Sequence, residues 1–429
     1  MKLLKILFCF IVVDFFFFST TFSFSYGYNT KELLAVVGLI IYALDMRRKG
    51  TFTVTRELLG LLILSATISF FALFSAYYHN TQERTYTTYF LSMLVWLSAA
   101  FTVIRTIKAV HGKLSIELVS TYIIAVATVQ GLIAVIADNY APLDNILLTY
   151  IPGLSWSKSV DRLYGFGATA TLDTGGIRFA IACVLCAHNI KSLVNVGQTK
   201  YIPLYVIAYL IITFTGNMVA RTTSVGSAIA LVYLLIYIFP FKTSIQKSVF
   251  SAWLWLLAGT VVTFFIIAAL YSSDPKFHDR TRFAFEGFFS LIEEGHWHTG
   301  SNDKLKSMYV FPDNPETWFI GDGYFINPSY DANYMGEDTI GFYKDTDVGY
   351  LRFIFFFGLL GLTAYTVFIL YAGSVCARLN PGNLLLSIVL TSMTFVIWFK
   401  VATDCFFILA VFICLGFVKS RMEPLPEEE

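Results

Sequence analysis

The chain has 429 residues, of which 56% are hydrophobic and 14% are charged, and its formal net charge is +1. A soluble domain carries about 25% charged residues, so this composition indicates a protein whose solvent is largely lipid. The mean hydropathy of +0.66 agrees with that interpretation. The near-neutral charge excludes a broadly basic nucleic-acid-binding protein. The composition therefore predicts an all-α integral membrane protein.

Apolar runs long enough to cross a bilayer, about 17 to 25 residues each, recur along the whole chain. The first run is too long for a removable signal peptide, and further runs follow it at once. We predict about twelve transmembrane helices, the last two of them forming a closely spaced hairpin. The predicted spans are 3–25, 32–46, 57–78, 86–105, 115–137, 177–195, 201–220, 223–240, 249–271, 348–373, 383–400 and 401–418.

Basic residues gather in alternate short loops between these runs. Loops rich in Lys and Arg remain on the cytoplasmic side of a membrane protein. We therefore expect both termini to be cytoplasmic, and an even number of spans agrees. The basic residues that set this orientation are Lys2, Lys5, Arg47, Arg48, Lys49, Arg56, Arg105, Lys108, Lys113, Lys191, Lys200, Lys242, Lys247, Arg378, Lys419 and Arg421.

Two predicted outer loops, 138–176 and 272–347, are too long to be simple connectors. The second is rich in Pro and Gly and holds the dense carboxylates of the chain. Its stretch 281–293 is predicted to form one amphipathic helix lying on the membrane surface. Residues 1–429 are therefore predicted to form a single polytopic membrane domain with a partial outer cap.

Several familiar site patterns are missing. The chain has no G-x-x-x-x-G-K-[ST], H-E-x-x-H or G-x-G-x-x-G motif, so nucleotide-driven transport and zinc hydrolysis lose their usual sequence support. His296 and His298 lack a third ligand at a characteristic spacing. Cys183 and Cys186 form C-x-x-C inside an apolar run, which favours helix packing over redox chemistry. No metal and no cofactor is predicted.

Arginines at the predicted outer membrane surface are the remaining candidates for chemistry. An arginine in the bilayer costs about 2.5 to 3.5 kcal/mol on insertion scales, so it usually faces a wet cavity or a partner. Each one alone could snorkel or form a structural ion pair. Several together suit a diphosphate, because guanidinium groups match phosphate oxygens. These candidates are Arg162, Arg178, Arg221, Arg280, Arg282 and Arg352.

The segment 346–361, TDVGYLRFIFFFGLLG, gives the strongest family signal. Asp347 is followed eleven positions later by Gly358 and fourteen positions later by Gly361. Together with R-x-x-G-F-G at 162–167 and Arg221 at the outer end of the seventh span, this pattern resembles the O-antigen ligase/polymerase superfamily. The resemblance extends over the whole hydropathy layout.

The ligase branch of that superfamily carries a histidine, followed by a small polar residue, where this chain has Asp347 and Val348. That difference favours the polymerase branch, in which the histidine is commonly absent. It also leaves the identity of the general base open.

The resemblance implies a GT-C-like membrane glycosyltransferase of the bacterial inner membrane. Such an enzyme joins undecaprenyl-diphosphate-linked repeat units on the outer face and releases undecaprenyl diphosphate, without metal or nucleotide. A separate chain-length regulator is a possible partner of the enzyme. Arg162 and Arg221 are expected to contact the lipid-linked donor, and Asp347 to lie on the acceptor side.

Asp347 is also the first candidate for the base that takes the acceptor proton. Asp345, Asp338 and Glu337 are the next candidates for this base. Asp345 and Asp347 spell D-x-D, the metal-binding pattern of soluble glycosyltransferases, which we interpret here as a coincidence because the arginines already supply positive charge. The alternative interpretation, without a catalytic role, is that all these carboxylates lie on a solvated face of the loop.

Three other functions compete with the polymerase. A ligase would transfer finished glycan to a lipid or protein acceptor. A carrier or flippase would move the glycan without bond chemistry and would favour buried charges at mid-span. Asp14 is the clearest such charge, and we expect it to pair inside the bundle. Metal-dependent membrane glycosyltransferases place paired acids in the first outer loop, where this chain offers Glu32 alone.

Overall fold

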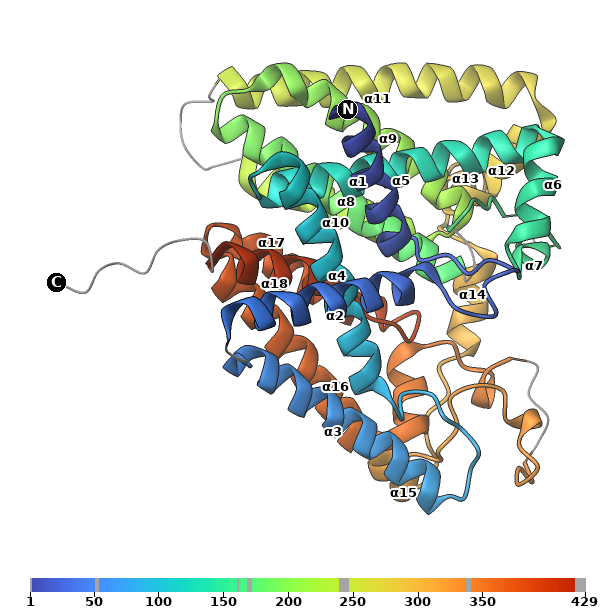
Figure 1. Cartoon of the computed structure of the whole chain (residues 1–429). Coiled ribbons are helices and arrows are strands. Elements are labelled where there is room, and N and C mark those ends of the chain that lie inside the picture. The colour runs from blue at the N-terminus through green and yellow to red at the C-terminus, as the bar shows by residue number, and fades with distance from the viewer. Residues whose placement is uncertain are drawn as a thin grey trace. The chain divides into compact units, whose positions relative to one another are not determined.

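The computed structural model describes residues 2–50, 54–159, 162–167, 172–238, 247–336 and 341–420, and Figure 1 shows their helices. The expectation of an all-α protein is confirmed within these ranges, which hold no strand and a single β-bridge between Thr21 and Asn29. The α-helices are α1 (Lys2–Phe17), α2 (Thr30–Lys49), α3 (Arg56–Tyr78), α4 (Tyr89–His111), α5 (Ile116–Asn139), α6 (Ala141–Tyr150), α7 (Leu154–Ser159), α8 (Leu172–Asn195), α9 (Ile202–Val219), α10 (Thr222–Ile238), α11 (Lys247–Ser273), α12 (Pro275–Ala284), α13 (Glu286–Glu293), α14 (Gly300–Ser307), α15 (Pro315–Ile320), α16 (Gly349–Leu379), α17 (Leu384–Ile397) and α18 (Phe406–Ser420).

Every predicted span overlaps one of these helices, yet not every helix has the length of a full crossing. Among the described residues, 7 helices are long and apolar enough to cross a membrane. Three shorter apolar helical segments are Thr222–Ile236, Pro381–Ile397 and Phe406–Ser420. Helix α1 ends at Phe17, well before the predicted end at residue 25. The chain is therefore a membrane-embedded helical protein. The long apolar helices are Arg56–Tyr78, Tyr89–His111, Ile116–Asn139, Thr174–Asn195, Thr199–Val219, Val249–Ser273 and Gly349–Leu379.

Both long predicted loops contain helices of their own. The 138–176 loop folds into α6 and α7, and the 272–347 loop into α12 to α15. The prediction of one amphipathic helix over 281–293 is wrong. Helix α12 ends at Ala284 and α13 begins at Glu286, because the backbone of Phe285 between them is not helical (φ −119°, ψ 25°).

The helices gather into two compact units, one of Met1–Leu34 with Val103–Trp297 and one of Ala35–Thr102 with His298–Glu429. In the first unit α8 is the central helix, packed by α5, α9 and α10. Small residues allow this close packing. A Cβ added at Gly226 of α10 would lie 2.3 Å from Ala180 of α8, and one at Gly176 of α8 would lie 2.8 Å from Ala220. Helix α11, by contrast, leaves most of its apolar surface exposed for lipid.

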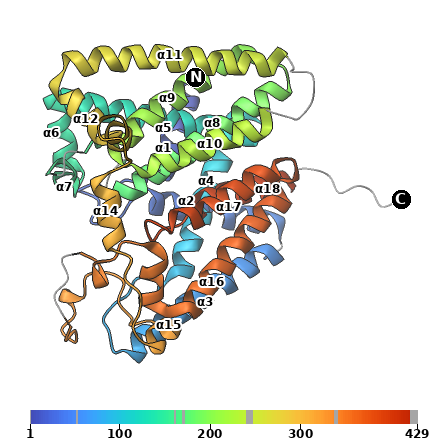
Figure 2. The same ribbon diagram turned by 180° about the vertical axis from the view of Figure 1, so that it is seen from behind.

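In the second unit α16 packs against α3, α17 and α18, and Figure 2 shows α3 and α16 running side by side. Helix α16 is broken at Phe357 and Gly358, where Gly358 takes a left-handed backbone (φ 66°, ψ −172°). The break frees backbone carbonyls inside an apolar helix, which is costly unless protein groups bind them. Ser75 Oγ donates to the Phe356 carbonyl at 2.7 Å, and the backbone N–H of Gly323 donates to it at 3.2 Å.

We predict that Gly358→Ala destabilises the protein by at least about 1 to 3 kcal/mol, because a side chain at this backbone geometry is strained. A Cβ there would also lie 2.1 Å from the Phe319 carbonyl oxygen. The loss should appear as a lower thermal midpoint of the detergent-purified protein. Gly382→Ala is the matched control, since its Cβ would meet no atom within 4 Å. Equal midpoints for the two variants would contradict this account of the break.

Candidate functional site

Arg221 lies at the junction between α9 and α10 in the first unit. Helix α9 ends at Val219, and Ala220 is extended (φ −155°, ψ 130°), so Arg221 projects from a short turn between two apolar helices. Its Nε donates to the Phe283 carbonyl at 3.0 Å, and its Nη2 forms an ion pair with Glu286 Oε2 at 2.5 Å. The side chain is 16% exposed. Arg221 thus keeps a charge at the surface of the bundle, held by the α12–α13 segment.

Arg162 is brought to the same place by the segment that follows α7. Its backbone N–H donates to the Ser157 carbonyl at 3.2 Å, and its Nη1 donates to the Val219 carbonyl at 3.4 Å. The guanidinium carbon of Arg162 lies 5.3 Å from the centre of the Phe283 ring, and that of Arg221 lies 4.3 Å from it. Both distances are within the range of cation–π attraction, about 6 Å. Two of the predicted arginines therefore converge on one aromatic ring.

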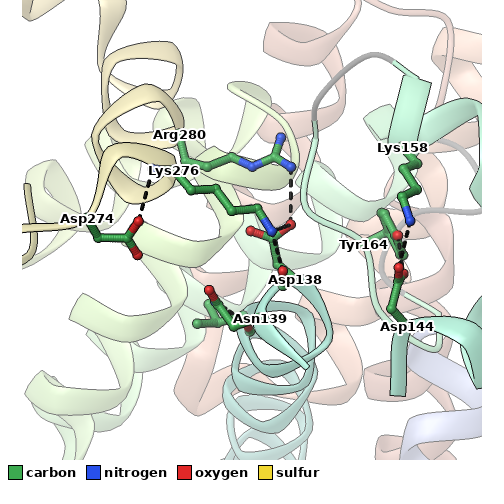
Figure 3. A network of polar contacts seen from close by, with 9 residues as sticks. Asp138, Asn139, Asp144, Lys158, Tyr164, Asp274, Lys276 and Arg280 are labelled. Atoms are coloured by element: carbon green, nitrogen blue, oxygen red, sulfur yellow. Dashed lines mark hydrogen bonds and ion pairs between the residues drawn. The ribbon is translucent and has the colours of Figure 1, made fainter. Parts of the chain in front are cut away.

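Helix α12 connects this pair to a second group of charges, shown in Figure 3. Arg280, three residues before Phe283, forms an ion pair with Asp138 Oδ1 at 3.2 Å, and Lys276 pairs with the same oxygen at 3.0 Å. Arg280 Nη1 is buried and makes no hydrogen bond within the part of the chain that the structure describes. The Arg280 side chain is 12% exposed. A cation pair thus shares one carboxylate at the end of α5.

The other half of this network is centred on Asp144 of α6. Lys158 Nζ donates to Asp144 Oδ2 at 2.7 Å, and the Tyr164 hydroxyl donates to Oδ1. Burial opposes ionisation of Asp144, but these two donors outweigh it and hold the pKa of the carboxyl below its ordinary value. Burial, together with the hydrogen bond to Asp144, raises the pKa of Tyr164. The contact between Asp144 and Tyr164 anchors the R-x-x-G-F-G segment 162–167, of which Tyr164 is the third residue.

Two further predicted arginines of this unit are engaged elsewhere. Arg178 is buried, and its guanidinium donates to the Phe17 carbonyl, to the Thr174 carbonyl at 3.0 Å and to Ser19 Oγ at 3.3 Å. Arg282 is exposed and forms a two-pronged ion pair with Glu293 at 2.7 and 2.6 Å. That pairing raises the pKa of Arg282 above its ordinary value. These contacts of Arg178 and Arg282 thus engage partners other than the Phe283 ring.

In the second unit Arg352 stands in the first turn of α16 and pairs with Asp347. Its Nη1 lies 3.5 Å from Asp347 Oδ1, and its Nη2 donates to the Phe325 carbonyl at 3.0 Å. The guanidinium carbon lies 3.9 Å from the Phe325 ring centre and 3.5 Å from that of Phe342. A planar cation stacked between two rings has a fixed orientation, so Arg352 in turn orients the carboxylate of Asp347, which is 27% exposed.

Asp345 occupies a strained turn in front of this pair. Lys344 and Asp345 both have left-handed backbones, with φ of 54° and 49°, which is costly for residues other than glycine. Asp345 Oδ1 accepts from the Gly341 N–H at 3.2 Å, an interaction that supports the turn. The remaining predicted carboxylates, Glu337 and Asp338, lie outside the described residues.

Two carboxylates of the second unit were missed by the sequence analysis. Glu83, in the loop between α3 and α4, is buried and accepts hydrogen bonds from the backbone N–H groups of Arg84, Thr85, Phe325 and Ile326. It therefore fixes the segment that carries the Phe325 ring under Arg352. The sequence signal that could have identified Glu83 is an acidic residue in the short polar segment QERT.

The second missed carboxylate, Asp404, lies between α17 and α18, inside a range that was assigned to a membrane span. It accepts from the Tyr89 hydroxyl at 2.9 Å, from the Tyr365 hydroxyl and from the Phe406 N–H at 2.8 Å. Among the described residues, no group of three or more His, Cys, Asp or Glu side chains is arranged to hold a metal. His296 and His298 pair with Glu294 and Asp303 instead.

No protein-family model, no curated protein and no solved structure matches this chain.

The Asp144 contact predicts a pH-dependent stability. Because the folded-state pKa of Asp144 is lowered, its contribution is present above the ordinary Asp pKa of about 3.9 and is lost as the pH falls through the lower folded value. Asp144→Asn should therefore lower the thermal midpoint at neutral pH, and the gap to wild type should close in strong acid. Asp279→Asn, at a side chain that is 83% exposed, should show no gap. A gap that persists in strong acid would contradict the assignment.

Proposed function

We propose that this protein is a membrane glycosyltransferase that polymerises undecaprenyl-diphosphate-linked oligosaccharide repeat units into O-antigen or capsular polysaccharide. The donor and acceptor would lie at the outer face of the bacterial cytoplasmic membrane, with about twelve spans and both termini inside the cell. The observation that carries the proposal is the convergence of Arg162 and Arg221 on the Phe283 ring. The resemblance of segment 346–361 to the O-antigen polymerase branch supports it.

The arginine pair suits a diphosphate leaving group. Negative charge grows on the diphosphate as the glycosyl–oxygen bond breaks, and fixed cations facing it lower the barrier. Two guanidinium groups lie over one ring, and Arg221 also pairs with Glu286. Guanidinium groups match the phosphate oxygens that such an anionic leaving group presents. The energy comes from the glycosyl–phosphate bond, so the reaction needs no nucleotide.

Asp347 is assigned the role of general base. The hydroxyl of the acceptor sugar attacks the anomeric carbon of the donor, its proton passes to the Asp347 carboxylate, and undecaprenyl diphosphate leaves. Arg352 orients that carboxylate through the ion pair at 3.5 Å. Asp345 is the alternative base, and its carboxylate supports the turn that precedes Asp347. A chain-length regulator is the expected protein partner.

We predict that Arg221→Ala lowers polymerisation about 100- to 1000-fold, the usual cost of removing one donor that stabilises developing charge. The assay uses purified protein and lipid-linked repeat units without metal or nucleotide, and reads ladder formation on a gel. Arg282→Ala, at an exposed arginine paired with Glu293, is the matched control and should keep the ladder. A normal ladder from Arg221→Ala would remove this arginine from the mechanism.

The same assay separates the competing functions. A ladder of free or lipid-linked polymer supports the polymerase. Transfer of preformed polymer to a lipid or protein acceptor, with no ladder from single repeats, would identify a ligase. Movement of intact lipid-linked repeats across proteoliposomes with no new glycosidic bond would identify a carrier, and either of these results would overturn the proposal.

We predict that Asp347→Asn abolishes the rise of activity with pH that a carboxylate base produces, while Asp345→Asn keeps it. The rate of ladder growth is measured from acidic to neutral pH for both variants. An amide at position 345 can still accept the Gly341 N–H bond, so the turn should survive. If Asp345→Asn loses the pH-dependent limb and Asp347→Asn retains it, the base is Asp345 and our assignment is wrong.

A further inference from the structure

A cavity of about 210 Å³ lies within the second unit, between helices α2, α3, α4 and α18. It is smaller than a drug-sized ligand pocket, which spans about 300 to 1,000 Å³. Its size suits a single slender chain rather than a bulky ring system. The residues that line it are Gly38, Leu39, Tyr42, Thr55, Leu58, Leu94, Leu97, Ser98, Phe101, Cys414, Phe417 and Val418.

The lining is almost entirely apolar, which does not favour water in the cavity. A buried water needs two to four polar partners, and the side-chain hydroxyls among the lining residues belong to Tyr42, Thr55 and Ser98. Thr55 Oγ1 already caps α3 by accepting the Leu58 N–H at 3.3 Å. Since α3 and α4 are long enough to cross a membrane, the natural content of such a cavity is hydrocarbon.

Close helix contact makes one end of the cavity rigid. A Cβ at Gly38 of α2 would lie 1.9 Å from the Ser98 carbonyl oxygen of α4, so only glycine allows these helices to approach so closely. Four residues further along α2, the Tyr42 ring meets Phe101 edge to face at 5.9 Å. A preformed wall of this kind holds a chain with little further ordering of the protein.

The cavity lies near helix ends that carry basic side chains. Arg47 and Arg48 follow Tyr42 in the last turns of α2, Arg56 follows Thr55 at the start of α3, and Lys419 follows Val418 near the end of α18. Only a short connection separates the end of α2 from the start of α3, so these two ends lie on one side of the membrane. Asp45 and Glu57 are the nearby acids in sequence, so basic residues outnumber acidic ones at these helix ends.

We infer that this cavity binds one acyl chain of an anionic phospholipid, whose phosphate is held by the basic helix ends. The apolar lining accounts for the chain, and the surplus of cations accounts for an anionic headgroup. The site is separate from the proposed glycosyl transfer. Its ligand would come from the surrounding bilayer and would stabilise the second unit by occupying the space between α2 and α18.

The test is native mass spectrometry of the purified full chain with phosphatidylglycerol or phosphatidylcholine of identical acyl chains. Wild type should retain one phosphatidylglycerol and hold it more tightly than phosphatidylcholine. The triple variant Arg47→Gln, Arg48→Gln, Arg56→Gln should lose roughly 100-fold of phosphatidylglycerol affinity, at about 1 kcal/mol for each basic residue. Lys2→Gln with Lys5→Gln, which removes two positive charges at exposed lysines of the other unit, is the control and should bind as wild type.

The cavity itself is tested by Leu94→Trp, which fills it. Leu91→Trp, one turn earlier on α4 at a residue that does not line the cavity and is 49% exposed, is the matched control. Leu94→Trp should lose the retained lipid while Leu91→Trp keeps it, and thermal midpoints without added lipid show that both variants fold. Retention of phosphatidylglycerol by Leu94→Trp, or equal affinity of wild type for the two lipids, would overturn the inference.

Discussion

The need to satisfy charge and backbone polarity among apolar helices governs this structure. In hydrocarbon no water is present to form hydrogen bonds with a guanidinium group or a peptide carbonyl. Each of these groups must therefore be bound by other protein groups. Arg178 meets this requirement with backbone carbonyls, Arg221 with Glu286 and the Phe283 carbonyl, and Arg352 with Asp347 between two aromatic rings. All three guanidinium groups are bound by acceptors of the protein, but they differ in their exposure and in the kind of partner that holds them.

Exposure and partners separate a structural arginine from a functional one. The guanidinium of Arg178 is enclosed by three acceptors of its own unit and is buried. Arg162 and Arg221 instead lie over one phenyl ring, that of Phe283, which attracts cations. The Arg221 side chain, which pairs with Glu286, is 16% exposed. We therefore assign the leaving group to Arg162 and Arg221 rather than to Arg178. The broken helix α16 shows the same logic for the backbone, since Ser75 and the segment after α15 bind the carbonyl that its break exposes.

The length of the apolar runs predicted where the long helices lie, because an apolar run has few alternatives to a helix in lipid. The gathering of Arg162 and Arg221 was also foreseeable, since both were assigned to the same outer face, Arg162 in the loop 138–176 and Arg221 at the outer end of the seventh span. The split at Phe285 and the roles of Glu83 and Asp404 were not. The roles of Glu83 and Asp404 depend on partners distant in sequence, Phe325 and Tyr89 respectively, which no local sequence pattern reveals. Asp14 was expected to pair inside the bundle, and Gln130 Nε2 does donate to its Oδ1 at 2.8 Å.

The central claim is that Arg162 and Arg221 together hold the diphosphate of a polyisoprenyl carrier. The most direct measurement is an electron cryo-microscopy structure of the full chain in a lipid nanodisc with undecaprenyl diphosphate. The account predicts phosphate oxygens within about 2.7 to 3.2 Å of both guanidinium groups, beside the Phe283 ring. Diphosphate density bound elsewhere, with the Arg221–Glu286 ion pair intact and Arg162 unchanged, would contradict it.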